Sequence, residues 1–147
     1  EKIYAQTVSN IDPVLRRIAK YAKTWVPHSS STAEMVRGDW EKIQRFMGEL
    51  GRTPSEMTKV YSNFVYVLGK GERPEAAVPH FSVYSGMDLP YWKEFYLVGE
   101  AEEVAEKIRG KIAALGGVEH VVLNPLHWGM DQLERLAAEV LPRVARP

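Results

Sequence analysis

The sequence predicts an α/β fold built from four consecutive βα units. Short runs of β-branched and aromatic residues alternate with longer amphipathic segments of helical period. Capping residues and glycines stand where these segments meet. Strands that alternate with helices pair in parallel through right-handed crossovers, so we expect a parallel sheet with helices packed against it.

The first unit is expected from a strand at residues 3–5, a polar loop at 7–10 and a helix. Asp12 is a suitable N-cap, and Pro13 suits the first helical position because its missing N–H would be unpaired there anyway. Apolar residues then recur on one helical face, which we expect to be buried: Val14, Ile18, Tyr21 and Ala22.

The second unit begins at residues 24–27, which read as a short buried strand or turn. Ser31 and Thr32 are cap candidates for the next helix, and Gly51 ends it as a left-handed C′ residue. The expected core stripe of that helix is Ala33, Val36, Trp40, Ile43, Phe46, Met47 and Leu50. Residues 59–68, rich in β-branched and aromatic residues, are expected to form the third strand.

Residues 72–98 are the least regular part of the sequence and are rich in aromatic residues. A short helix is expected from about residue 90 to 97, with Asp88 or Leu89 near its cap. The aromatic residues are Phe81, Tyr84, Tyr91, Trp92, Phe95 and Tyr96. An insert of this length either forms a lid over an apolar substrate or packs as a hydrophobic cap.

The closing unit is expected from a helix at 102–115, a strand at 118–123 and a final helix capped by Asp131. Gly116 and Gly117 between the first two supply a left-handed C-cap and a tight turn. The inward face of the final helix is expected to hold Leu133, Leu136, Ala137, Val140 and Leu141, with Pro142 ending or kinking it.

Four such units correspond to the second half of an eight-stranded βα (TIM-type) barrel, since a complete barrel takes roughly 250 residues and this chain has 147. We therefore expect residues 1–147 to form a single half-barrel domain, the C-terminal portion of a larger barrel. The sequence opens at Glu1 without an initiator methionine, as a trimmed chain would. A half-barrel exposes two strand edges, so the expected partner is the missing N-terminal half or a second copy in a homo-oligomer.

Composition excludes several classes of function. The 19 basic and 19 acidic side chains cancel, which leaves no electrostatic footprint for nucleic acid or a membrane surface. Cysteine is absent, so disulfides, thiolate metal sites and a cysteine nucleophile are excluded, and a cytoplasmic location fits. The four histidines are too scattered in sequence for a metal site. A small-molecule substrate remains.

Four segments carry a resemblance to a known family: IYAQTVSNIDPVLRRIAKYAKTWVPH, WEKIQRFMGELGRTPSEM, LVGEAEEVAEKI and EHVVLNPLHWGMDQLERLAAEVLPRV. In this order they resemble strands five to eight of the luciferase-like monooxygenases. That family folds as eight-stranded βα barrels and uses FMN or the deazaflavin coenzyme F420. The closing segment is most similar to the deazaflavin-dependent branch.

The resemblance implies a cofactor phosphate seat in the loop after the first strand. The small polar side chains there are Thr7, Ser9 and Asn10, and the backbone N–H groups of Val14 and Leu15 would face the loop from the helix N-terminus. The family often has glycine in this loop, and this sequence has none. The alternative is that these residues are ordinary turn and capping residues.

Four residues are candidates for the substrate pocket: His28, His127 and Trp128, which follow strands, and Asn63, which interrupts an apolar strand and could point into the barrel near the cofactor. His28 could instead cap the next helix, and Asn63 could belong to a structural hydrogen-bond network. His127 and Trp128 could form a packed loop. His120, at the start of its strand, is expected to be structural, and His80 has no identifiable partner.

The implied function is that of a fragment of an oxidoreductase that uses the deazaflavin coenzyme or FMN for hydride transfer or monooxygenation. The family's catalytic residues, notably a histidine near the end of an early strand, belong to the absent first half. The chain alone is therefore not expected to be active. The alternatives are a stand-alone half-barrel that serves binding or assembly without catalysis, and an anion-binding module that keeps only the phosphate seat.

Overall fold

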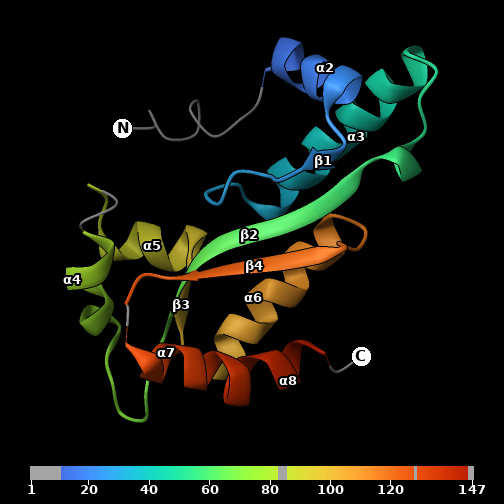
Figure 1. The fold of residues 1–147 in the computed structure, drawn as a ribbon. Helices are drawn as coiled ribbons and strands as arrows, with labels where there is room; N and C mark the ends of the chain where they lie inside the picture. Colours follow the sequence, from blue (N-terminus) through green and yellow to red (C-terminus); the bar gives the residue numbers. More distant parts are fainter. Residues whose placement is uncertain (1–10, 83–85, 128, 146–147) are drawn as a thin grey trace. The chain divides into compact units, whose positions relative to one another are not determined.

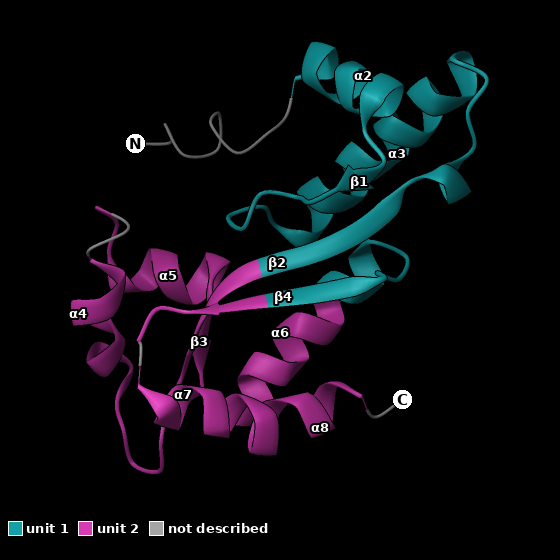
Figure 2. Ribbon diagram, in the orientation of Figure 1, with its two compact units in different colours: residues 1–62, 111–122 teal, residues 63–110, 123–147 magenta. Residues whose placement is uncertain are grey.

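The computed structural model describes residues 11–82, 86–127 and 129–145. The predicted strand at residues 3–5 and the loop at 7–10 lie outside this part of the chain. The chain divides into two compact units, coloured separately in Figure 2: residues 1–62 with 111–122, and residues 63–110 with 123–147. The single-domain organisation stays a prediction.

Unit 1 begins with a pair of packed helices, α2 (Asp12–Tyr21) and α3 (Ala33–Glu49) (Figure 1). The predicted cap of α3 is confirmed, because the Thr32 hydroxyl accepts the Met35 N–H at 3.2 Å. Gly51 follows the helix with a φ of 71°, a conformation that favours glycine. Local capping chemistry therefore determines both ends of α3.

The predicted start and buried face of α2 are wrong. Its N-cap is Ile11, and the Asp12 carboxylate accepts from the Lys42 ammonium at 2.9 Å instead of capping the helix. The buried positions are Leu15 and Ala19, whereas Tyr21 is 70% exposed. Two apolar stripes lie next to each other on this helix, and periodicity cannot tell which of them the neighbouring helix covers.

The predicted strand at 24–27 is β1 (Thr24–Trp25), and it pairs in parallel with the amino end of β2 (Thr58–Val67). The Trp25 indole is buried and stacks on Trp40 of α3, with ring centroids 5.5 Å apart and an interplanar angle of 11°. The buried apolar residues of unit 1 include Val36, Ile43, Phe46, Met47, Met57 and Val60.

In unit 2 the carboxyl end of β2 pairs in parallel with a strand that the sequence did not predict, β3 (Leu97–Gly99). The predicted helix at 90–97 is α5 (Leu89–Phe95), and the Asp88 carboxylate caps it by accepting the Tyr91 N–H at 3.1 Å. Three residues are too few to show the alternation of a strand, which is why β3 escaped prediction. The α/β fold with a parallel sheet is confirmed.

The helix predicted at 102–115 is α6 (Ala101–Ala114), and the strand predicted at 118–123 is β4 (His120–Pro125), which pairs with β2. Gly116 and Gly117 connect them with φ values of 65° and 92°, as predicted. The first residues of β4 are exposed: Val121 at 37% and Val122 at 44%.

Within unit 2, a side chain continues the row of hydrogen bonds between β2 and β4 beyond the end of β4. The Leu126 N–H donates to the Val65 carbonyl at 3.4 Å. One pleat further along β2, the Gln132 amide accepts the Val67 N–H at 2.8 Å and donates to the Val67 carbonyl at 3.0 Å. Gln132 is fully buried, and its amide takes the place of one residue of a neighbouring strand.

The final helical segment comprises α7 (Met130–Arg135), a π-helical turn (Leu136–Val140) and α8 (Leu141–Val144). Its N-cap is Gly129, and the predicted inward face is only partly right. Leu136 and Val140 are buried, but Leu133 and Leu141 are 49% and 47% exposed, and Ala137 is exposed. Pro142 lacks an N–H and crowds the preceding turn, which accounts for the π geometry there.

The aromatic insert packs as a hydrophobic cluster in unit 2. It includes a 3₁₀ turn (Pro74–Ala77), α4 (Val78–Phe81) and α5. The cluster consists of Tyr66, Leu68, Ala77, Phe81, Trp92, Val98 and Leu126. This favours the cap over the lid for the described part of the insert; Tyr84 lies outside it. Among the described residues, no helix has the length and apolar character needed to cross a bilayer.

Candidate functional site

The predicted phosphate seat lies at the N-terminus of α2, and only its helical side is described. The Val14 N–H donates to the Ile11 carbonyl at 2.9 Å, and the Leu15 N–H donates to the same oxygen at 3.2 Å. Both amides are therefore engaged within the first helical turn. Thr7, Ser9 and Asn10 lie outside the described residues, so the seat stays a prediction.

Cations surround the start of α2. The Lys42 ammonium, hydrogen-bonded to Asp12, lowers the pKa of that carboxyl, and the charges of Arg45 and Arg16 lower it further. Arg16 also pairs with Glu49 at 2.8 Å. The local field therefore suits an anion, although Asp12 itself would repel one.

His28 lies in the turn before α3. Its Nδ1 accepts the Ser30 N–H at 3.2 Å, and its carbonyl accepts the Ser31 N–H at 3.0 Å. The imidazole thus orders the turn that leads into the helix. This contact supports the capping alternative for His28.

Asn63 is 1% exposed and ties three segments of unit 2 together. Its Nδ2 donates to the Phe95 carbonyl at 3.0 Å, and its Oδ1 accepts the Phe64 N–H at 2.8 Å. The Asn124 amide of β4 donates to the Asn63 carbonyl at 3.2 Å. These contacts support the structural-network alternative, since a buried amide needs such partners.

His127 belongs to a closed circuit of six polar side chains at the carboxyl end of β2, here called the polar ring. Its members come from β2, the loop after it, α4, the loop after β4 and α7, all within unit 2. They are Tyr66, Glu72, His80, His127, Asp131 and Arg135.

One side of the polar ring centres on Glu72. Its carboxylate accepts the Gly69 N–H at 2.7 Å, the Tyr66 hydroxyl at 3.0 Å and the Arg135 guanidinium at 3.1 Å. The Gly69 N–H, first among these, holds the pKa of Glu72 below its usual value. Burial, followed by the hydrogen bond to Glu72, raises the pKa of Tyr66 to about 12. This side is an ordered, charge-assisted network.

The other side contains two imidazoles. The His80 ring stacks on Tyr66 with centroids 5.3 Å apart, and it lies 4.5 Å from the His127 ring. His127 Nε2 lies 3.6 Å from Asp131 Oδ1, and Arg135 Nη2 lies 3.6 Å from Asp131 Oδ2. Burial, and then the neighbouring His127, lower the pKa of His80.

Two glycines leave the room that the polar ring occupies. A Cβ on Gly129 would lie 2.2 Å from Asp131 Oδ1 and 2.5 Å from His127 Nε2. A Cβ on Gly69 would lie 2.9 Å from an Arg135 nitrogen. Neither glycine has a positive φ, so the absence of a side chain is a matter of space.

Most of the polar ring could not be predicted from the sequence, because its members are far apart along the chain. His80 had no visible partner, yet it lies beside His127. The one signal available was that Glu72, His127 and Asp131 all follow predicted strands, whose carboxyl ends meet at one edge of a parallel sheet. Trp128 lies outside the described residues. Among the residues that are described, no three metal-ligating side chains converge.

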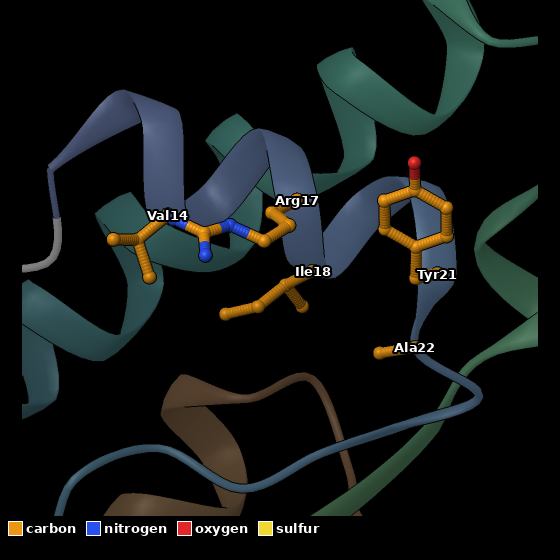
Figure 3. Close-up of a pocket in the computed structure, with 5 residues that line it drawn as sticks. All are labelled: Val14, Arg17, Ile18, Tyr21 and Ala22. Carbon is orange, nitrogen blue, oxygen red and sulfur yellow. The ribbon is translucent and has the colours of Figure 1, made fainter.

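A groove on α2 in unit 1 is a second candidate site, after the polar ring. It is an open depression of about 440 Å³, lined by Val14, Arg17, Ile18, Tyr21 and Ala22. Figure 3 shows these side chains along one side of the helix. They include every residue of the face that the sequence predicted to be buried. An apolar face of this kind marks a surface for packing.

No protein-family model matches the sequence, and no curated protein matches it. Solved structures do match. An F420-dependent secondary alcohol dehydrogenase in complex with an F420-acetone adduct aligns with a TM-score of 0.72 at 17% identity, over 92% of this chain and 47% of that chain.

Two further structures agree. The coenzyme F420 dependent tetrahydromethanopterin reductase from Methanopyrus kandleri aligns with a TM-score of 0.63 at 16% identity, over 91% of this chain and 49% of that one. The oxygenating constituent of 3,6-diketocamphane monooxygenase from Pseudomonas putida, in complex with FMN, aligns with a TM-score of 0.61 at 20% identity. The alignment covers 92% of this chain and 46% of that one.

The chain therefore spans about half the length of the structures that it matches. At these identities the likeness concerns the fold. The chain is a structural match to the luciferase-like monooxygenases over about half of their length, as its sequence segments predicted.

Proposed function

We propose that this chain supplies the second half of the barrel of a luciferase-like oxidoreductase, which uses the deazaflavin coenzyme F420 or FMN. One observation carries the proposal: more than nine-tenths of the chain aligns with about half of enzymes whose names specify those two cofactors. The resemblance in the closing segment favours the deazaflavin.

The cofactor would supply hydride transfer or oxygenation, and the protein would position it and exclude water. In this proposal Thr7, Ser9 and Asn10 hold the cofactor phosphate at the start of α2. The described residues fit that role in part. Lys42, Arg45 and Arg16 give a cationic environment. The amides of Val14 and Leu15 are already paired, so they would act through the helix dipole.

The test is a titration of the chain with FMN and with F420. Binding is measured by the quenching of cofactor fluorescence and by amide exchange at the start of α2. Asp12→Asn should tighten binding severalfold, because it removes the carboxylate nearest the proposed phosphate position. Glu41→Gln, which removes an exposed carboxylate elsewhere in unit 1, is the matched control. Binding of neither cofactor, by the chain alone or with the first half of a barrel added, would refute the proposal.

A second candidate function, assembly without catalysis, is favoured by the groove on α2. If the chain serves assembly through this groove and not catalysis, Tyr21→Lys will abolish self-association measured by sedimentation. Neither the wild type nor the variant will then bind FMN or F420. Cofactor binding that survives Tyr21→Lys supports the oxidoreductase instead.

A further inference from the structure

We propose that His127 exchanges a proton with a hydroxyl or carbonyl oxygen of a small substrate, and that Asp131 and His80 are its positioning residues. The proposal deepens the proposed function, since an oxidoreductase that interconverts an alcohol and a carbonyl must move a proton as well as a hydride. It goes further because it assigns an acid–base group to this half of the fold.

The placement of His127 is the first support. It follows β4 directly, at the carboxyl end of a strand in a parallel sheet, which is where α/β folds bind their ligands. Its side chain is 38% exposed, so a substrate can reach it, whereas a fully buried imidazole could not be reached. His80, by contrast, lies between Tyr66 and His127.

The second support is the pairing of His127 with a carboxylate. Asp131 Oδ1 lies 3.6 Å from Nε2 and stabilises the imidazolium that forms when His127 takes up a proton. Asp131 is itself held, because its other oxygen lies 3.6 Å from the Arg135 guanidinium. A base oriented by a second group that is oriented by a third is the recurring arrangement of acid–base sites.

The third support is Gly129. Its missing side chain leaves the space in which the Asp131 carboxylate and the His127 imidazole approach each other. Any larger residue would push both side chains away, although it would strain no backbone torsion. The contact is therefore built into the loop between β4 and α7.

The proton transfer is simple. The O–H bond of a bound alcohol breaks, its electron pair stays on oxygen, and an N–H bond forms on the His127 imidazole. His80 limits this step electrostatically, because two imidazoliums 4.5 Å apart repel each other. The other charged or titratable groups of the polar ring are Tyr66 of β2, Glu72 in the following loop, and Asp131 and Arg135 of α7.

The first arm of the test needs no cofactor. The imidazole C–H and ring ¹⁵N resonances of His80 and His127 are followed by NMR against pH in wild type, Asp131→Asn, Gly129→Ala and His120→Gln. We expect Asp131→Asn and Gly129→Ala each to shift the Nε2 resonance of His127, because each removes the carboxylate from its side. His120→Gln, at the exposed start of β4, should change nothing. An unchanged His127 Nε2 resonance in both variants would overturn the positioning role of Asp131.

The same spectra test His80. His127→Gln should raise the titration midpoint of His80, because it removes the like charge. A His80 midpoint that stays in place would show that the two rings titrate independently, and would overturn the positioning role of His80.

The second arm measures turnover of a small secondary alcohol by the assembled barrel with its cofactor. His127→Gln should lower kcat by about 10²–10⁴-fold and leave cofactor binding unchanged. Gly129→Ala should lower kcat less and leave KM unchanged, because it displaces the two side chains without removing either of them. Full turnover in His127→Gln would overturn the assignment of His127 alone. No turnover in wild type would overturn both this assignment and the proposed function.

Discussion

At the scale of single residues, Lys111 of α6 carries a charge in a place that disfavours it. Its ammonium donates to the Ser31 carbonyl within unit 1. Burial lowers its pKa from 10.5 to about 8. The folded state binds fewer protons than the unfolded chain between these two values, so the charged form costs folding free energy below pH 8. That cost fades as the pH rises toward 10.5.

Lys111→Met should therefore stabilise unit 1 at neutral pH. After allowance for the lost hydrogen bond and for solvent screening, we expect a gain of about 1 kcal/mol in the free energy of unfolding. Urea unfolding at neutral pH and again above pH 10 measures it, and the gain should be smaller at the higher pH. Lys23→Met, which removes an exposed lysine from the same unit, should have no such effect. Destabilisation by Lys111→Met at both pH values would contradict the prediction.

His80 makes the free energy of unfolding of unit 2 depend on pH below 6.5. Because its pKa lies below 6.5 in the folded state, the unfolded chain binds the proton more readily. Stability is therefore complete above pH 6.5 and falls as the pH drops from 6.5 toward the folded pKa. His80→Gln should flatten the dependence of the urea midpoint in this range. A dependence as steep as in wild type would contradict the prediction, because Glu72, whose pKa is also lowered, acts only at more acidic pH.

At the scale of elements, the end of β2 depends on α7 through Gln132. Gln132→Ala removes both hydrogen bonds to Val67, whose backbone is buried. We expect a loss of roughly 1–3 kcal/mol in unfolding free energy, because the Val67 N–H is left without its acceptor. Amide exchange at Val67 should accelerate, while that of Leu68, which donates to Gly99, changes less. Unchanged exchange at Val67 would show that the side chain is not part of the ladder.

The elements also show what the sequence could predict. Helix ends with local chemistry, such as Thr32, Asp88 and Gly51, were found because the signal lies within a few residues. The strand β3 and the buried side of α2 were not, since both are decided by a neighbour distant in sequence. The polar ring was not predicted for the same reason, because its members come together only in the folded chain.

At the scale of the whole molecule, the chain matches about half the length of solved barrel enzymes and exposes apolar strand residues. Val121 and Val122 of β4 are the clearest case. An exposed apolar strand invites pairing with another chain, so we expect wild type to self-associate and to bind a hydrophobic dye.

Val122→Lys should reduce both, because a charge on an exposed strand opposes strand-to-strand pairing. Sedimentation velocity and dye fluorescence measure the two effects. Leu141→Lys, on an exposed position of α8, is the matched control. A wild-type chain that sediments as a compact monomer and binds no dye would contradict the prediction.

The two glycines of the polar ring would leave a recognisable mark in a genetic screen. Where alanine is excluded by a left-handed torsion, shortening a neighbouring side chain does not relieve the strain. At Gly129 the obstacle is the ends of two side chains, and at Gly69 it is the end of one. Defects at these positions should therefore have intragenic suppressors: shortening Arg135 should rescue Gly69→Ala. The positions of the suppressors would thus identify members of the polar ring independently of the structure.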